Sequence, residues 1–264
     1  KTLVLGHRNP DTDSICSAIC YAGFKHQLTG ENYEPCRAGN VNPETQYVLD
    51  YFKLKAPRLV ENVKTQVKDI EIRKTKGVSR GISLKNAWGL MQENNVVTLP
   101  CVTEEGLLEG VITIGDITKS YMNLYDSSII SKACTKYANI LDTLEGSMVV
   151  GDSEAYFDRG KVLIAAANPD LMENYIEKHD LVILGNRYES QLCAIEMEAG
   201  CIIVCEGAGV SLTIRKLAQE RGCAVITTPY DTYTTARLIN QSMPISYFMT
   251  KENIIEFSEE DYLD

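Results

Sequence analysis

A series of short apolar runs, each of strand length and each separated from the next by a helical segment, is the feature that most constrains the fold. Four such runs follow one another in the second half of the 264-residue chain. Strands that alternate with helices of this length form a parallel sheet, because each helix carries the chain back across the sheet. The sequence therefore predicts an α/β fold. The runs cover residues 162–166, 181–185, 201–205 and 224–227, with predicted helices at 169–178, 188–199 and 211–221.

Charge and cysteine usage narrow the class of partner. The formal net charge is −10, and nucleic-acid binding needs clustered Lys and Arg, so the sequence predicts no nucleic-acid partner. Every apolar run is far shorter than the roughly 20 residues of a membrane-spanning helix, and no membrane contact is expected. Nine cysteines lie scattered in apolar segments without a Cys-X-X-Cys pair. This usage favours reduced thiols and a cytoplasmic location.

Residues 1–63 form another alternating stretch, with strands expected at 2–5 and 57–63 and helices at 13–28 and 42–52. Asn42 as N-cap, followed by Pro at the first helical position, predicts where the second helix begins. The stretch is predicted to be a small parallel α/β portion.

Metal-ligating side chains cluster between the first strand and the first helix. His7, Asp11 and Asp13 fall within seven residues. Loops at the carboxyl ends of parallel strands bind ligands in α/β sheets, and imidazole with carboxylate oxygens suits Mn, Co or Mg. The start of the helix also favours a phosphate. The alternative is an ordinary turn in which Asp11 or Asp13 caps the helix, and the spacing alone leaves both readings open.

The segment GHRNPDTDSICSA around this cluster resembles the first motif of the DHH phosphoesterase superfamily, in the form seen in manganese-dependent (family II) inorganic pyrophosphatases. The similarity continues through AGNVNPETQYVLDYF to about Val63. The resemblance implies that His7, Asp11 and Asp13 are ligands of a two-metal site, with Mn, Co or Mg as cofactor. It implies hydrolysis of inorganic pyrophosphate to phosphate.

The sequence departs from that family in one respect. The family uses later ligands, including an Asp-His-His motif, and a domain rich in Lys and Arg. This sequence has three histidines, His7, His26 and His179, and no Asp-His-His. We therefore expect that the sequence lacks the C-terminal part of the family pattern, and that the chain by itself has little or no pyrophosphatase activity.

Residues 64–125 contain a segment similar to a CBS (cystathionine β-synthase) motif, SLKNAWGLMQENNVVTLPCVTEEGLLEGVITIGDITKSYM. The resemblance implies that Thr113 and Asp116 contact the phosphate and ribose of an adenine nucleotide, which would be AMP, ADP, ATP or a dinucleoside polyphosphate. A hydroxyl and amides at a helix start can hold phosphate, and a carboxylate can accept from ribose hydroxyls. The alternative for Asp116 is a helix cap.

Further candidates around this motif come from position alone. Within this segment, helices are expected at 83–93 and from 116, and strands at 96–102 and 107–112 with a turn between them. Ser79 precedes the first helix, Val97 lies on the central strand, and Lys74 adds positive charge with Lys76 and Arg80. Trp88 lies at helical spacing from apolar neighbours, so we expect it in the core rather than at a stacking surface.

Residues 126–228 resemble a DRTGG domain through CIIVCEGAGVSLTIRKLAQERGCAVITTPYDTYTTARLINQSMP, without the signature pentapeptide. The glycine loop at 206–211 has no Walker Lys-Ser/Thr pair and is expected to be a tight turn. Residues 229–264 resemble the start of a second CBS motif. The predicted order is a DHH-like portion (1–63), CBS motif (64–125), DRTGG domain (126–228) and an incomplete second CBS motif (229–264).

Two functions follow from these patterns. One is a metal-dependent pyrophosphatase regulated by adenine nucleotides bound at the CBS region. The other is an adenine-nucleotide-binding module without catalysis. Since a lone CBS motif leaves much of its sheet uncovered, we also expect a homodimer.

Overall fold

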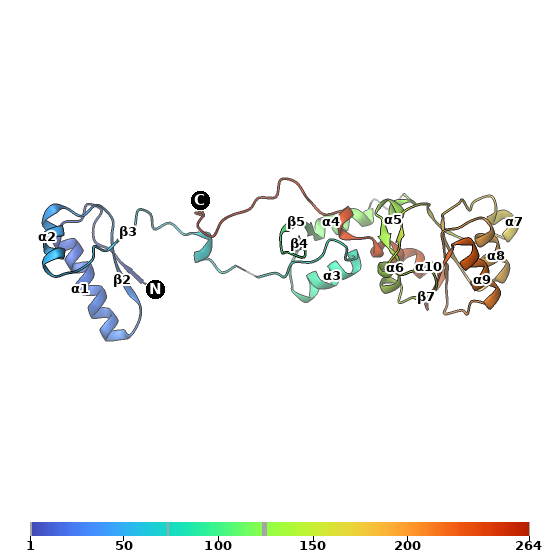
Figure 1. Ribbon diagram of the computed structural model, residues 1–264, viewed down its shortest axis with the longest axis horizontal. Helices are drawn as coiled ribbons and strands as arrows, with labels where there is room; N and C mark the ends of the chain where they lie inside the picture. The colour runs from blue at the N-terminus through green and yellow to red at the C-terminus, as the bar shows by residue number, and fades with distance from the viewer. Residues whose placement is uncertain (1, 73, 123–125, 264) are drawn as a thin grey trace. The chain divides into compact units, whose positions relative to one another are not determined.

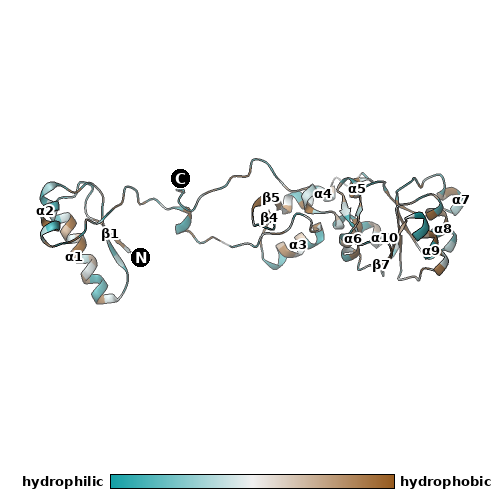
Figure 2. Cartoon of the chain, in the orientation of Figure 1, coloured by the Kyte–Doolittle hydropathy of each residue, from teal (hydrophilic) through white to brown (hydrophobic). Residues whose placement is uncertain are grey.

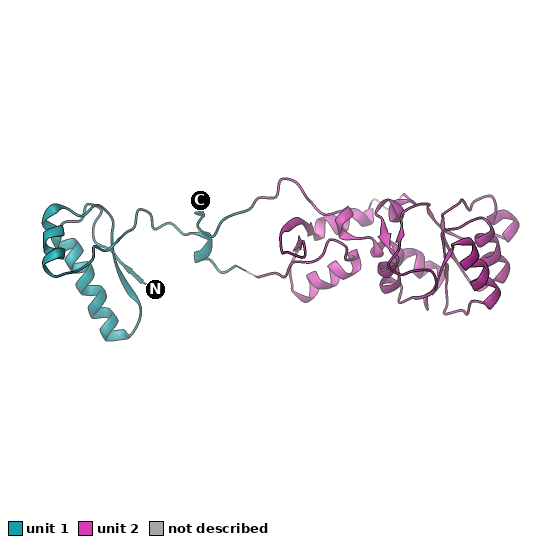
Figure 3. Ribbon diagram, viewed as in Figure 1, with its two compact units in different colours: residues 1–72, 256–264 teal, residues 73–255 magenta. Residues whose placement is uncertain are grey.

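The computed structural model describes residues 2–72, 74–122 and 126–263. Its described residues form two compact units, a first unit of residues 1–72 with 256–264 and a second unit of residues 73–255 (Figure 3). This division is coarser than the four predicted domains, whose boundaries stay predictions. None of the described helices is long and apolar enough to cross a membrane.

The first unit contains the predicted small parallel sheet, in the order β1–β2–β3. Helix α1 begins after its N-cap Asp11, whose side chain accepts a hydrogen bond from the Ser14 amide, and it ends at Gly30 in the left-handed conformation. Asn42 caps α2 as predicted, by accepting from the Thr45 amide. The elements are β1 (Thr2–Val4), α1 (Thr12–Thr29), β2 (Tyr33–Arg37), α2 (Pro43–Tyr51), β3 (Arg58–Leu59) and the short helix η1 (Val67–Asp69) (Figure 1).

The second unit begins with the expected helix–strand–turn–strand–helix segment. Strands β4 and β5 form an antiparallel pair, and both edges of the pair are extended by single bridges. Val78 pairs in parallel with Cys101, and Thr250 pairs antiparallel with Val111. A residue from near the end of the chain therefore extends the sheet formed by residues 98–113. The elements are α3 (Leu84–Glu93), β4 (Thr98–Val102), β5 (Leu108–Thr113) and α4 (Ile114–Met122).

A five-stranded sheet forms the rest of the second unit, in the order β7–β12–β11–β10–β9. Four strands are parallel, as predicted, and β7 joins β12 antiparallel. The strands are β7 (Ser147–Val150), β9 (Val162–Ile164), β10 (Leu181–Leu184), β11 (Cys201–Val204) and β12 (Ala224–Thr227).

Helices cover both faces of this sheet, so the central strands β10 and β11 are buried along their whole length, whereas the edge strands β7 and β9 are partly exposed. One face packs in a cluster with Ile195 and Ile214 from α8 and α9. The other face packs with Ile140 from α6 and with residues of the CBS-like segment, in one continuous core. The helices carry mixed apolar and polar colours in Figure 2, as amphipathic helices do. They are α6 (Tyr137–Thr143), α7 (Pro169–Met172), α8 (Tyr188–Glu196), α9 (Leu212–Arg221) and α10 (Thr232–Leu238).

Some local expectations were wrong or incomplete. The helix predicted at 169–178 ends at Met172. Asp180 organises the following turn, because its buried carboxylate accepts from the amides of Glu177 and Lys161. Trp88 is not a core residue, since it is 40% exposed. Helix α6 and the short elements η1, α5 (Ile129–Lys132), β6 (Thr135–Lys136), β8 (Tyr156–Phe157) and η3 (Ile245–Tyr247) were not predicted, and η2 (Ile239–Ser242) directly follows α10.

Candidate functional site

The loop between β1 and α1 brings two of the three predicted metal ligands together. His7 Nε2 lies 3.4 Å from Asp11 Oδ1, and both side chains are exposed. The same Asp11 oxygen accepts a 2.9 Å hydrogen bond from the Ser14 amide. This hydrogen bond lowers the pKa of Asp11, and the nearby His7 lowers it further. Asp11 is therefore a helix cap whose carboxylate also lies beside an imidazole.

Asp13 is not drawn into that pair. It lies in the first turn of α1, where its Oδ1 accepts from the Ser17 hydroxyl at 3.2 Å. Across residues 2–72, 74–122 and 126–263, no group of three His, Cys, Asp or Glu side chains is arranged to hold a metal ion. The donor types suit a divalent cation, but in the described geometry only His7 and Asp11 lie close together, and Asp13 does not join them.

Close backbone packing fixes this loop. A Cβ added to Gly6 would lie 1.8 Å from Ser14 Oγ and 3.1 Å from Ser14 Cβ. A Cβ added to Gly39 would lie 2.5 Å from the Arg8 carbonyl oxygen and 2.7 Å from Pro10 Cδ. Ser14 is 8% exposed, and its hydroxyl has no hydrogen-bond partner among the described groups. The two glycines thus let the loop lie directly against α1 and the chain after β2.

In the second candidate site, at the junction of β5 and α4, the two predicted residues hydrogen-bond to each other. Thr113 donates to Asp116 Oδ2 from its hydroxyl at 2.7 Å and from its amide at 3.0 Å. The Asp116 amide returns a hydrogen bond to Thr113 Oγ1 at 3.2 Å. The two predicted residues are in contact, in the reciprocal pattern of a capping box. A ribose or phosphate bound here would compete with the Thr113–Asp116 hydrogen bond.

The other nucleotide candidates are spread over the CBS-like segment. Val97 contacts the same junction through its backbone, since its carbonyl accepts from the Ile114 amide at 3.0 Å. Ser79 lies towards the other end of β4, because its neighbour Val78 pairs with Cys101 whereas Thr113 pairs with Thr98. Lys74 is exposed and outside regular structure. The structure therefore groups Thr113, Asp116 and Val97, and places Ser79 and Lys74 elsewhere.

Ser79 borders a groove that the sequence did not reveal. The groove has a volume of about 890 Å³ and lies among the segment before α3, the α5–α6 region and the chain around η3. Arg80 reaches Glu109 at 3.1 Å and Lys136 pairs with Glu154. Sequence spacing could not find these residues, because three distant segments supply them. Its polar and aromatic side chains include Ser79, Arg80, Asn139, Lys136, Tyr156, Tyr247 and Lys251.

Helix α6 ties the CBS-like segment to the five-stranded sheet. Asn139 donates to the Gly81 carbonyl at 3.0 Å, and Asn86 donates to Asp142 Oδ2 at 3.1 Å. Lys85 donates to the Asp142 carbonyl at 3.1 Å. These three hydrogen bonds connect the CBS-like segment directly to helix α6.

This architecture defines a class of protein, a CBS motif joined to an α/β domain with a loop of metal-ligand type in a separate unit. Comparison with known families agrees with it. The CBS domain family matches residues 67–123, and the DRTGG domain family matches residues 139–242. The resemblance to these two domains is thereby confirmed.

Relatives extend the match to nearly the whole chain. The cobalt-dependent inorganic pyrophosphatase of Clostridium perfringens is 40% identical over 261 residues, which is 99% of this chain and 48% of that protein. A probable manganese-dependent inorganic pyrophosphatase of Thermotoga maritima is 30% identical over 96% of this chain and 46% of that protein. The manganese-dependent inorganic pyrophosphatase of Bacillus subtilis is 59% identical over 70 residues, 26% of this chain and 22% of that protein. The chain spans about half the length of the first two relatives.

A solved structure covers the second unit's domains. It is the crystal structure of the CBS and DRTGG domains of the regulatory region of Clostridium perfringens pyrophosphatase, complexed with activator, diadenosine tetraphosphate. The TM-score is 0.71 at 36% identity, over 75% of this chain and 86% of that chain. The chain therefore contains the CBS and DRTGG domains of a pyrophosphatase regulatory region, and over nearly its whole length it is similar to inorganic pyrophosphatases.

Proposed function

We propose that the second unit is a regulatory region that binds an adenine nucleotide, with a dinucleoside polyphosphate as its preferred ligand. The observation that carries this proposal is the similarity, across both domains, to a regulatory region complexed with diadenosine tetraphosphate. Thr113 and Asp116 supply a hydroxyl and a carboxylate at a helix start, which suit phosphate and ribose. Val97 lies at the same junction, whereas Ser79 and Lys74 lie elsewhere in the CBS-like segment and are proposed to contact a more distant part of the nucleotide.

We propose that the first unit contributes His7, Asp11 and Asp13 as ligands of Mn or Co, or of Mg, in hydrolysis of inorganic pyrophosphate. Such an ion supplies Lewis acidity and lowers the pKa of bound water. Asp11 and His7 would be the first two ligands of this ion, and Asp11 also caps the start of α1. In the absence of the later ligands of the family pattern, the 264 residues alone are expected to release little phosphate from pyrophosphate. Phosphate release at typical enzymatic rates, with Mn or Co present, would overturn that expectation.

Binding of nucleotide is tested by equilibrium dialysis with AMP, ADP, ATP and diadenosine tetraphosphate. We expect saturable binding, with the dinucleotide tightest, and a loss of about tenfold or more in Asp116→Ala. Asp170→Asn, an exposed change in the DRTGG-like part, is the control and should bind as the unaltered chain does. If none of the four nucleotides binds, the regulatory proposal fails.

We further propose a cytoplasmic homodimer whose partners are small molecules, pyrophosphate and nucleotide, rather than nucleic acid or membrane. No disulfide joins the nine cysteines, all of which lie in the described residues, and this fits a reducing compartment. Trp88 and Tyr121 are 40% and 43% exposed and border one apolar hollow with Leu84 and Ile117. Burying these rings against a second copy is favourable. Sedimentation should give a dimer at micromolar concentration, and a monomer would contradict the assembly.

A further inference from the structure

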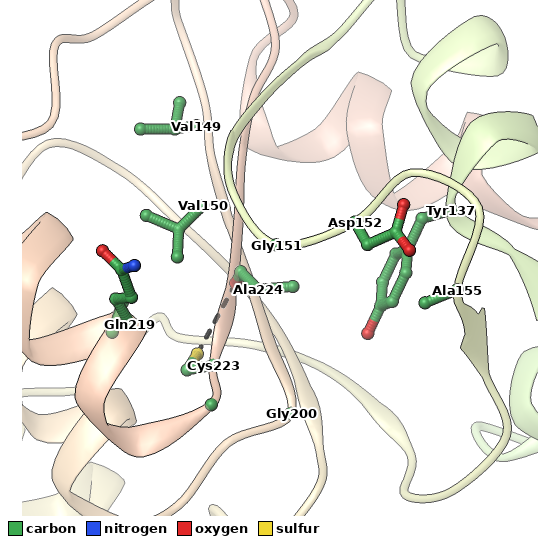
Figure 4. A pocket seen from close by; sticks show the side chains of 12 residues that line it. Tyr137, Val149, Val150, Gly151, Asp152, Ala155, Gly200, Gln219, Cys223 and Ala224 are labelled. Carbon is green, nitrogen blue, oxygen red and sulfur yellow. Dashed lines mark hydrogen bonds between the residues drawn. The ribbon is translucent and has the colours of Figure 1, made fainter.

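A cavity in the DRTGG-like part of the second unit has no role in the proposed nucleotide or metal sites. It has a volume of about 520 Å³, within the roughly 300–1,000 Å³ of small-molecule sites. It lies where β7 turns back, beside the end of α9 and the start of β12 (Figure 4). This is the amino end of the parallel strands, opposite the edge where α/β sheets usually bind ligands.

A buried phenol is directed into this cavity. Tyr137, the first residue of α6, is only 8% exposed, and it lines the cavity with its hydroxyl pointing away from its own helix (Figure 4). The hydroxyl makes no hydrogen bond within the described part of the chain. Burial raises the pKa of Tyr137, so the phenol stays neutral, and its oxygen is available as an acceptor. The hydroxyl is not one of the fully buried unpartnered atoms, so it is accessible from the cavity, where a bound molecule can donate to it.

The rest of the lining is rich in acceptors and negative in character. Asp152 lines the cavity and uses Oδ1 to accept from the Glu154 amide at 2.9 Å, and no hydrogen bond to its Oδ2 is formed within the described residues. Gln219 adds an amide oxygen. Helix α9 ends here at Gly222, so the negative end of its dipole faces the cavity. The nearby cation Lys136 is held by Glu154 and does not line the cavity.

The lining excludes anions and favours donors. Among the described residues that border the cavity, there is no Lys, Arg or His, so a phosphate or carboxylate would meet only negative or neutral groups. Apolar walls from Val149, Val150 and Cys223 suit a carbon skeleton. An N–H-bearing cation can donate to Asp152 and Tyr137 and can also contact the ring face of the tyrosine.

We propose that this cavity is a binding site for a small amphipathic organic cation, an amine or an amidine with an apolar body. Asp152 neutralises the charge, Tyr137 and Gln219 accept N–H groups, and the valines contact the body. The site is separate from the nucleotide proposal and stands or falls without it. Because Tyr137 begins the helix that holds Asn139 and Asp142 against the CBS-like segment, an occupant would touch the connection between the two domains.

Three ring compounds of nearly the same shape but different charge test the proposal: benzamidine, benzamide and benzoate, titrated into the full chain by calorimetry and followed by protein NMR. We expect saturable binding of benzamidine, binding of benzamide weaker by about tenfold or more, and none of benzoate. Asp152→Asn should weaken benzamidine about tenfold, and Tyr137→Phe about threefold or more. Tyr175→Phe and Asp170→Asn, exposed positions in the same domain, should change nothing.

Several outcomes would overturn the site. The first is that benzamidine does not bind at concentrations up to about 10 mM. The second is that benzamide binds as tightly as benzamidine, and the third is that benzoate binds. Unchanged affinity in both Asp152→Asn and Tyr137→Phe would do the same. The thermal midpoint of each variant is measured in parallel. If Tyr137→Phe lowers the thermal midpoint, the test of the site rests on Asp152→Asn, because the Asp152 side chain is exposed and its replacement should not affect folding.

Discussion

The loop before α1 and the start of α4 each use an aspartate as a helix-capping group, and the two aspartates differ in their exposure and in their hydrogen-bond partners. Asp11 accepts from the Ser14 amide and stays exposed beside His7. Asp116 accepts from both the amide and the hydroxyl of Thr113. The first carboxylate is exposed beside an imidazole, whereas the second is engaged in internal hydrogen bonds that a ligand would have to replace. A helix cap and a ligand-binding carboxylate are therefore compatible roles, and the environment decides how much each is used.

The largest expected difference between the two loops is in the free energy of unfolding when a glycine of each loop is replaced by alanine. We expect Gly6→Ala to lower the free energy of unfolding of the first unit by about 1–3 kcal/mol, because the new Cβ overlaps Ser14. Gly115→Ala, before Asp116, is the matched control. Its Cβ meets only Thr113 Oγ1 at 3.4 Å, and within a helix the change should be neutral or stabilising by up to about 1 kcal/mol.

Urea unfolding of both variants measures this difference. Ser14→Ala in the Gly6→Ala background should recover part of the loss, since it removes the overlapping oxygen. Equal stability of Gly6→Ala and the unaltered chain would show that the loop does not rest on α1 as described.

Asp11→Asn separates capping from metal binding. Asparagine caps helices as well as aspartate does, so stability should change by less than about 0.5 kcal/mol. Loss of the charged oxygen beside His7 should weaken Mn²⁺ binding about tenfold or more. Electron paramagnetic resonance of free Mn²⁺ measures the affinity. If Asp11→Asn binds Mn²⁺ as tightly as the unaltered chain, the Asp11–His7 pair is not a metal site and only the cap remains.

Thr113→Val tests the hydrogen bond between Thr113 and Asp116 at the start of α4. The change removes the 2.7 Å hydroxyl bond to Asp116 and keeps the shape, so we expect a stability loss of about 1 kcal/mol. Nucleotide affinity should fall about threefold to tenfold, since the hydroxyl is also the proposed phosphate contact. Thr118→Val, an exposed position one turn further along α4, is the control. An increase in affinity would mean that Thr113 only competes with the ligand for Asp116.

The smallest effect concerns pH. Lys132 first, and then Ser128, lower the pKa of Asp126 from 3.8 to about 2. A carboxyl with a lowered folded pKa stabilises the fold above its unfolded pKa and loses that contribution as pH falls through the folded value. The contribution is thus complete above about pH 4 and disappears towards pH 2. Asp126→Asn should be slightly less stable than the unaltered chain at pH 6, and the gap should close near pH 2. A gap that persists at pH 2 would contradict the pairing, and Asp170→Asn should show none at either pH.

The sequence predicted most of the regular elements because their signals are local. Asn42, Ser83 and Ser211 each accept from an amide three residues later, where a helix was expected to begin. The parallel order of β9 to β12 follows from the helices between them. The antiparallel pairing of strand β7 with β12 and the bridge from Val111 to Thr250 could not be predicted, because they join segments far apart in the chain.

The candidate sites were predictable as residue types and less so as geometry. The spacing of His7 and Asp11 correctly indicated a common loop, but the side-chain direction of Asp13 towards Ser17 depends on a rotamer. Trp88 has the helical spacing of a core residue and is nonetheless exposed. The cavity beside Tyr137 depends on a turn, a helix end and a strand start that meet only in the folded chain.

Calorimetric titration of diadenosine tetraphosphate into the chain, and into Asp116→Ala, tests the central claim that the second unit is a nucleotide-binding regulatory region. We predict saturable heat for the unaltered chain, with affinity reduced about tenfold or more in the variant. No measurable binding to the folded, unaltered chain would contradict it.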